Sequence, residues 1–162
     1  MRVPHYATLG NHELAADEVY FQRVYGRGSY QFAFHDLAFT VLDSASATID
    51  PRVYGCLDGW LANARGRGHI FTTHIPSLDP VGTRSTAFAS RSEGSLLLAE
   101  AGVDLTLYGH VHSFYAFENA GIPAYISGGG AAPERLDGIG RNYLTVDPAR
   151  GTFLHVGVVR ID

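Results

Sequence analysis

Three short polar clusters, each following an apolar stretch, constrain the fold of this chain most strongly. They are Gly10-Asn11-His12-Glu13, Thr73-His74-Ile75-Pro76 and Gly109-His110-Val111-His112. Short apolar stretches that stop at glycine or at a polar turn are typical of buried strands. In α/β proteins strand ends meet at one edge of a sheet, and functional side chains gather there. We therefore expect the three clusters to lie together at one sheet edge.

The rest of the chain alternates between strand-like and helix-like patterns. Helices are predicted over Leu14–Tyr25, which stops at Gly26, over Cys56–Arg65, and over Ser95–Ala101, which Gly102 closes. Thr83–Ser92 is predicted to be a loop, and Ser90 and Glu93 have capping-box spacing before the third helix. Strands are predicted over Val3–Leu9, Tyr30–Phe34, Leu37–Leu42, His69–Thr73, Val103–Tyr108, Ile122–Ile126, Tyr143–Val146 and Phe153–Ile161, with turns at His35-Asp36 and at residues 147–151.

This mixture of helices with several adjacent strands predicts an α/β fold, a sandwich of sheets flanked by helices. A length of 162 residues suits a single domain over 1–162 with a hydrophobic core. Hydrophobic residues make up 46% and charged residues 17% of the chain, which is a globular composition and not a disordered one.

Charge and cysteine content exclude several other classes. The net charge is −4 and the sequence has no basic run, so nucleic acid is not expected as a scaffold partner, although a phosphodiester substrate remains open. The single cysteine, Cys56, has no metal-type spacing and is expected to be a half-buried residue on a helix. No segment approaches the roughly 18 consecutive apolar residues of a membrane span. The sequence indicates neither a compartment nor a particular substrate.

Histidine nitrogen and asparagine oxygen are suited to zinc, iron and manganese. His110 and His112 are two positions apart, so in an extended loop both side chains point to one side. Each cluster also has a simpler interpretation: Asn11 is a plausible N-cap with Glu13 near the positive end of a helix, His74-Ile75-Pro76 alone is a turn, and Gly109-His110-Val111-His112 alone is a surface turn. The order of all three, each after an apolar strand, favours a metal site. His5, His35, His69 and His155 belong to no cluster and are expected to be structural or solvent-facing.

Taken in order, the three clusters resemble the second half of the signature of calcineurin-like metallophosphoesterases. The resemblance extends over nearly the whole chain, and Ser127-Gly128-Gly129-Gly130 is similar to the purple-acid-phosphatase-like branch. It implies sheets and helices in α/β/β/α layers. It also implies Asn11, His74 and His110 as ligands of one metal ion and His112 as a ligand of a second.

The same resemblance implies a hydrolase of phosphate mono- or diesters that uses two iron, zinc or manganese ions. In the family, a hydroxide held between the two metals attacks phosphorus, because the metals lower the pKa of water and neutralise the phosphate oxygens. His12 matches the histidine that protonates the leaving group or stabilises the charged oxygens. Glu13 is positioned to orient His12.

The family pattern begins with Asp-x-His and Gly-Asp-x-x-Asp, and neither occurs in this sequence. We therefore expect the C-terminal portion of the domain, without its N-terminal strands. The chain should bind at most one metal ion and should hydrolyse phosphoesters weakly in isolation. It should also expose a sheet edge through which it can associate with another chain. The alternatives are a non-catalytic metal-binding or partner-binding remnant, and an α/β domain with unrelated histidines.

Overall fold

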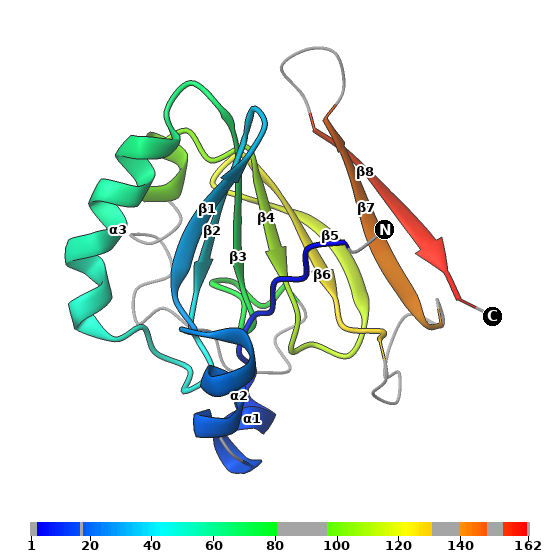
Figure 1. The fold of residues 1–162 in the computed structure, drawn as a ribbon. Coiled ribbons are helices and arrows are strands. Elements are labelled where there is room, and N and C mark those ends of the chain that lie inside the picture. The colour runs from blue at the N-terminus through cyan, green and yellow to red at the C-terminus, as the bar shows by residue number, and fades with distance from the viewer. Residues whose placement is uncertain (1–2, 17, 81–96, 131–139, 149–153, 162) are drawn as a thin grey trace.

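A six-stranded mixed sheet forms the centre of the molecule (Figure 1). The computed structural model describes residues 3–16, 18–80, 97–130, 140–148 and 154–161. The strand order is β1-β2-β3-β4-β6-β5, with β2, β3, β4 and β6 parallel and the outer strands antiparallel to their neighbours. The strands are β1 (Tyr30–Phe34), β2 (Leu37–Leu42), β3 (Gly68–Thr73), β4 (Leu105–Tyr108), β5 (Phe114–Asn119) and β6 (Ile122–Ser127).

Helix α3 (Pro51–Ala64) packs on one face of this sheet. It begins five positions before the predicted start at Cys56, because Asp50 caps it by accepting a hydrogen bond from the Arg52 N–H and Pro51 occupies the first turn. The Cys56 side chain is exposed and not half-buried. The core between helix and sheet consists of Leu42, Ile49, Leu57, Leu61, Phe71, Ile75, Leu98, Val103 and Ile122.

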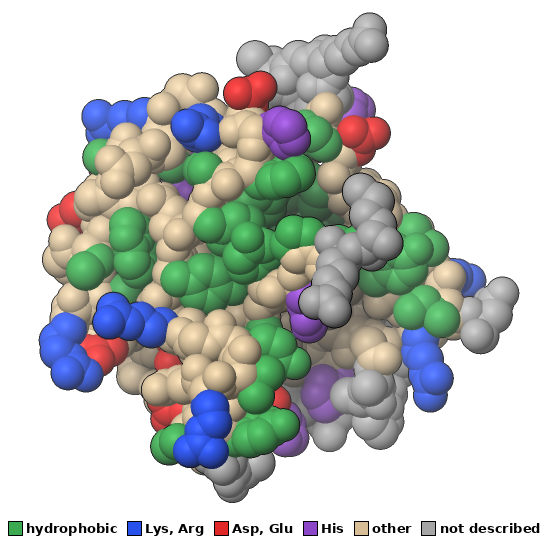
Figure 2. Space-filling view, in the orientation of Figure 1, with side chains coloured by type: hydrophobic (Ala, Val, Ile, Leu, Met, Phe, Trp, Pro, Cys, Tyr) green, Lys and Arg blue, Asp and Glu red, His purple; other side chains and the backbone are tan. Residues whose placement is uncertain are grey.

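The opposite face of the sheet carries aromatic side chains. The Tyr6 ring stacks on Phe32 at a centroid distance of 3.8 Å, and Phe32 stacks on Phe39 at 4.7 Å. Figure 2 shows hydrophobic side chains across the middle of this face. Val3–Leu9 was predicted to be a strand, but the structure assigns it to neither sheet. Instead it lies on this face, where Tyr30 donates a hydrogen bond to the Ala7 carbonyl and Leu9 is fully buried.

The helix predicted over Leu14–Tyr25 forms as two pieces, α1 (Asn11–Ala16) and α2 (Glu18–Tyr25), and Gly26 follows with a φ of 89°. Strand β5 was not predicted. It pairs with β6 through a tight turn at Ala120 and Gly121, whose φ values of 52° and 79° are those of a hairpin turn. In the third predicted helix residues 97–100 are helical, and Gly102 has a φ of 75°. Thr83–Ser92 and the Ser90–Glu93 capping box lie outside the described residues.

A separate two-stranded sheet pairs β7 (Asn142–Pro148) with β8 (Leu154–Arg160). Figure 1 shows this hairpin beside the β6 and β5 side of the main sheet. Ser127 at the end of β6 donates a hydrogen bond to Asn142 at the start of β7, which joins the two sheets. The fold is therefore a mixed α/β fold of sheets flanked by helices, as predicted. In the part of the chain that the structure describes, no helix is both long and apolar enough to span a membrane.

Candidate metal centre

The three polar clusters meet at the carboxyl edge of the six-stranded sheet. His74 directly follows β3, His110 follows β4 by two positions, and Asn11 opens α1. The Oδ1 atom of Asn11 lies 2.9 Å from Nε2 of His74 and 3.2 Å from Nδ1 of His110. An amide oxygen only accepts hydrogen bonds, so each ring nitrogen donates to it when it carries the ring proton, and it can bind a metal ion when the proton is on the other ring nitrogen. Residues 63 and 99 positions away from Asn11 thus contact one oxygen atom.

His74 lies at the centre of the cluster, between two glycines. A Cβ at Gly10 would lie 3.2 Å from Nδ1 and Cε1 of the His74 ring, and a Cβ at Gly109 would lie 3.2 Å from Nδ1. Side chains at either position would press on the ring, which explains why both polar clusters begin with glycine. The His110 ring meets the His74 ring edge to face at a centroid distance of 5.3 Å.

The start of α1 explains how Asn11 is freed for the cluster. The Gly10 N–H donates to Oε2 of Glu13 at 2.8 Å, and the Glu13 N–H donates back to the Gly10 carbonyl at 3.2 Å. This is the Glu half of a capping box, with Gly10 at the N-cap. The interpretation of Asn11 as N-cap is therefore wrong, and its side chain turns to the histidines. The Glu13 carboxylate binds the Gly10 backbone, and its predicted action on His12 stays a prediction.

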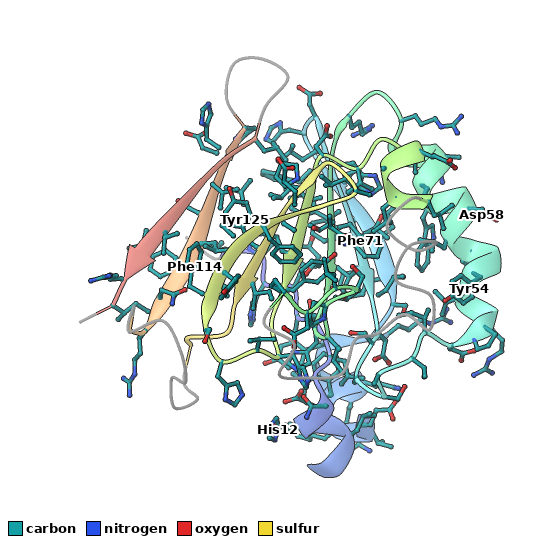
Figure 3. The ribbon with its side chains drawn as sticks, turned by 180° about the vertical axis from the view of Figure 1, so that it is seen from behind. His12, Tyr54, Asp58, Phe71, Phe114 and Tyr125 are labelled. Atoms are coloured by element: carbon teal, nitrogen blue, oxygen red, sulfur yellow. The ribbon has the colours of Figure 1, made fainter. Side chains whose placement is uncertain are left out.

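His12 and His112 flank this cluster. His12 is exposed on α1 (Figure 3), and His112 is partly buried in the loop after β4. Both lie close enough to His74 that their positive charge would lower the pKa of that ring. His110 adopts a φ of 64°, so the chain is not extended at His110 and strand-like alternation does not apply there. That both histidines face one metal centre stays a prediction. The structure therefore brings Asn11, His74 and His110 into contact, with His12 and His112 nearby.

The local environment keeps His74 neutral. Burial, and next the neighbouring His110, lower the pKa of His74 to about 4, although the Glu13 carboxylate acts in the opposite direction. A neutral imidazole is the form that binds metal ions, since a protonated ring has no free lone pair. At neutral pH no proton has to be removed from a charged His74 before a metal binds.

The donor set fits one transition metal. Ligand atoms about 2.1 Å from a common ion lie about 3.0–3.4 Å apart in octahedral or tetrahedral geometry. The separations of 2.9 and 3.2 Å from the Asn11 oxygen to the two ring nitrogens are close to that range. Within the described ranges, no three His, Cys, Asp or Glu residues form a group that could hold an ion, so Asn11 is needed to complete a three-donor set.

A second glycine contact supports the loop that carries the β4 histidines. A Cβ at Gly128 would lie 1.7 Å from the Val111 carbonyl oxygen, and the Gly128 N–H donates to the Ser113 carbonyl at 3.1 Å. The backbone after β6 therefore lies directly against residues 111–113. Through Gly128, the Ser127–Gly130 segment, which the sequence analysis gave as similar to the purple-acid-phosphatase-like branch, packs against the histidine loop.

Two hollows adjoin these elements. A cavity of about 330 Å³ lies between the main sheet and β7, and His74, Thr72, Leu107 and Tyr143 are among its lining residues. A larger hollow of about 750 Å³ lies between α2, α3 and the 43–50 loop and includes none of the candidate ligands. The smaller cavity is therefore the one that opens beside the candidate metal centre.

Comparison with known proteins agrees with this arrangement. A family model described as calcineurin-like phosphoesterase matches residues 1–114, and no curated protein matches the chain. One similar solved structure is GAP50, described as the anchor in the inner membrane complex of Plasmodium, with a TM-score of 0.51 and 16% sequence identity. The match covers 84% of this chain and 55% of that one, so this chain spans little more than half of its length. At this identity the likeness concerns the fold alone.

Proposed function

The chain belongs to the calcineurin-like phosphoesterase family, and on that premise we propose that it holds a transition metal ion through Asn11, His74 and His110 for the hydrolysis of phosphate mono- or diesters. The observation that carries the proposal is the convergence of one amide oxygen and two ring nitrogens at 2.9 and 3.2 Å. Zinc, iron and manganese all suit this donor set.

Each residue has a distinct task in this proposal. When bound, the metal supplies Lewis acidity to a phosphoryl oxygen and lowers the pKa of water. Asn11, His74 and His110 would hold this metal next to the sheet edge. His12 is exposed beside them and donates a proton to the leaving oxygen. Glu13 fixes the start of α1 through the Gly10 N–H and so sets the position of His12.

His112 is assigned to a second metal position, as in the family. That position needs further ligands, because the described residues offer no additional cluster of His, Cys, Asp or Glu around it. The proposal therefore gives one metal ion to this chain, and a partner segment with carboxylates would have to complete the second.

The alternative function is a non-catalytic metal-binding or partner-binding role. The observation that favours it is the small donor set: two histidines and an asparagine can hold an ion without supporting a two-metal displacement. The fold does not decide between the two, since one fold can serve catalysis or binding. GAP50 itself is described as an anchor.

Metal binding tests the proposal directly. After removal of metal by a chelator, the chain is titrated with Zn²⁺ or Mn²⁺ and the bound ions are counted by elemental analysis. We expect about one ion per chain. The His74→Ala and His110→Ala variants should lose it, whereas His35→Ala, in the exposed β1–β2 turn, should keep it. Equal binding by His74→Ala and the unchanged chain would refute the site.

A further inference from the structure

The peptide group that follows His74 is held at both ends by the segments that follow the neighbouring strands β4 and β2. Its carbonyl, on His74, accepts a hydrogen bond from the Gly109 N–H at 3.0 Å. Its N–H, on Ile75, donates to Oγ of Ser44 at 2.8 Å. A third bond, from Oγ1 of Thr73 to the Ile75 carbonyl at 2.8 Å, closes the turn. The backbone around His74 therefore has little freedom to rotate.

Ser44 supplies this contact at a point where the regular ladder has ended. Leu42, the last residue of β2, pairs with Thr73, the last residue of β3. Beyond it the β2 chain turns away, because the Asp43 carboxylate accepts a hydrogen bond from the Ala45 N–H at 2.9 Å. The Ser44 side chain then replaces the backbone acceptor that β2 no longer offers.

Burial makes this contact strong and specific. Ser44 is 0% exposed and Ile75 is 2% exposed, so water cannot take the place of the hydroxyl. When a buried N–H loses its acceptor, the folded chain is destabilised by the full desolvation penalty of that group. The backbone then shifts until the N–H can donate to another acceptor. Any such movement rotates the peptide next to His74 and displaces the ring from Asn11.

We propose that Ser44 is a positioning residue for the metal ligand His74, and that it acts through the Ile75 N–H. The inference rests on the proposed function, because it takes His74 to be a ligand. Ser44 touches neither metal nor substrate. It fixes the ψ angle of His74 and so the direction in which the ring nitrogen points.

The test compares Ser44→Ala with Thr40→Val. Thr40 lies in β2, is 0% exposed like Ser44, and contacts Nε2 of His69 at 2.9 Å. Thr40→Val therefore removes an equally buried hydroxyl that lies away from the candidate metal centre. Each chelator-stripped variant is titrated with Co²⁺, whose visible spectrum reports its ligands. Ser44→Ala should bind Co²⁺ at least about tenfold more weakly, as when outer-shell partners of metal ligands are lost, with an altered spectrum. Thr40→Val should keep the affinity and spectrum of the unchanged chain.

A second readout separates this proposal from the proposed function. Ring ¹⁵N chemical shifts, measured without metal, should change for His74 in Ser44→Ala and for His69 in Thr40→Val. If the unchanged chain binds no Co²⁺, the proposed function fails. The ¹⁵N shifts of the His74 ring then remain as the test of whether Ser44 positions His74. Unchanged His74 shifts in Ser44→Ala, or equal effects of both variants on His74, would overturn the positioning role.

A measurement on the unchanged chain covers the case in which Ser44→Ala does not fold. The Ile75 amide should exchange its hydrogen slowly, at a rate similar to that of amides inside β3, because Ser44 accepts its hydrogen bond. Exchange as fast as that of an open loop would show that the contact does not hold the backbone, and the proposal would fail.

Discussion

His69 lies near the start of β3 and His74 directly follows the strand, five positions later. Burial lowers the pKa of both rings. Their surroundings nevertheless give them different tasks. His69 faces α3, and its Nε2 lies 2.9 Å from Oγ1 of Thr40 inside the core. His74 faces Asn11 at the sheet edge. The prediction that His69 is structural agrees with its burial, and His5, His35 and His155 are exposed.

The low pKa of His69 predicts how stability depends on pH. Burial lowers this pKa below the ordinary 6.5, and Asp104 only partly offsets the effect. At a pH between the pKa of His69 in the folded chain and the ordinary 6.5, the unfolded chain binds a proton at His69 and the folded chain does not. The stability that His69 contributes is therefore fully present above pH 6.5 and is lost as the pH falls toward the folded-state pKa. In metal-free protein, urea unfolding at stepped pH should show this decrease.

Matched variants assign that slope. His74 has a lowered pKa too and contributes in the same direction, so His69→Gln should remove a part of the slope and not all of it. His35→Asn, in the exposed turn where a φ of 51° suits asparagine, should leave the slope unaltered. An undiminished slope in His69→Gln would show that the prediction is wrong.

At the scale of elements, the loop after β4 depends on the segment after β6. Gly128→Ala places a methyl group 1.7 Å from the Val111 carbonyl oxygen, which neither backbone can accept without moving. We expect this variant to lose more than about 2 kcal/mol of unfolding free energy, which is an overpacking effect. Metal affinity should decrease as well, since residues 110–112 would shift. Thermal unfolding and Zn²⁺ titration measure the two effects, and a normal value for both would exclude the contact.

Gly59→Ala is the matched change in a different element and should have the opposite effect. Gly59 is exposed in the middle of α3, and a Cβ there would meet nothing within 4 Å. Glycine inside a helix is destabilising relative to alanine, so the variant should gain about 0.5–1 kcal/mol. Urea unfolding measures the gain, and metal binding should not change. A loss of stability would mean that α3 is not the regular helix described.

The elements that the sequence predicted well are those in which local pattern and tertiary position agree. Strands β1 and β2 occur with the predicted bounds, and β3, β4 and β6 within two residues, because each is apolar and ends at a turn. Val3–Leu9 has the same pattern but no strand partner. β5 was missed because polar and aromatic residues alternate weakly there, and because its turn at Ala120 and Gly121 lacks the Asn-Gly or Asp-Gly pair that signals a hairpin.

In the candidate site, too, the sequence predicted the residues that stand in a local motif and missed those that act through distant contacts. Asn11, His74 and His110 were predicted as one group because each stands in a short motif after an apolar stretch. Ser44 and Gly128 were not, since each acts on the backbone of a distant segment: Ser44 contacts a residue 31 positions away. A serine after a strand or a glycine in a glycine-rich run carries no local pattern that reveals such a contact.

At the scale of the whole molecule, the main sheet has two edges, β1 and β5, and an aromatic face that is partly covered. Phe34, at the end of β1, is 59% exposed, and Tyr115 of β5 is 37% exposed. Within the described part of the chain no further strand pairs with β1 or β5, and unpaired edges with apolar side chains favour pairing with another chain. We expect the chain to self-associate, as measured by sedimentation across a concentration series. Phe34→Lys should reduce that association, and a monomer at every concentration would contradict the expectation.

Catalytic turnover is the property of the whole molecule that separates the two candidate functions. The described residues gather three donors around one point, which suits one metal ion. One ion polarises a phosphoryl oxygen, but in-line attack also needs an activated and aimed nucleophile, and positioning of that kind lowers barriers by several kcal/mol. We therefore expect these 162 residues alone to hydrolyse p-nitrophenyl phosphate weakly or not at all with Mn²⁺ or Zn²⁺.

Supplying the absent ligands should then reveal whether the site is catalytic. A segment that bears Asp-x-His and Gly-Asp-x-x-Asp, fused ahead of Met1, should raise turnover. His12→Ala in that fusion should lower the rate about 10²–10⁴-fold with metal content unchanged, the usual effect of losing a general acid. Strong metal-dependent turnover by the unfused chain, abolished in His74→Ala, would disprove the view that three donors are too few. A fusion that binds two ions and stays inactive would instead assign the chain to the non-catalytic alternative, because both metal positions would then be filled and the phosphoester would still not be hydrolysed.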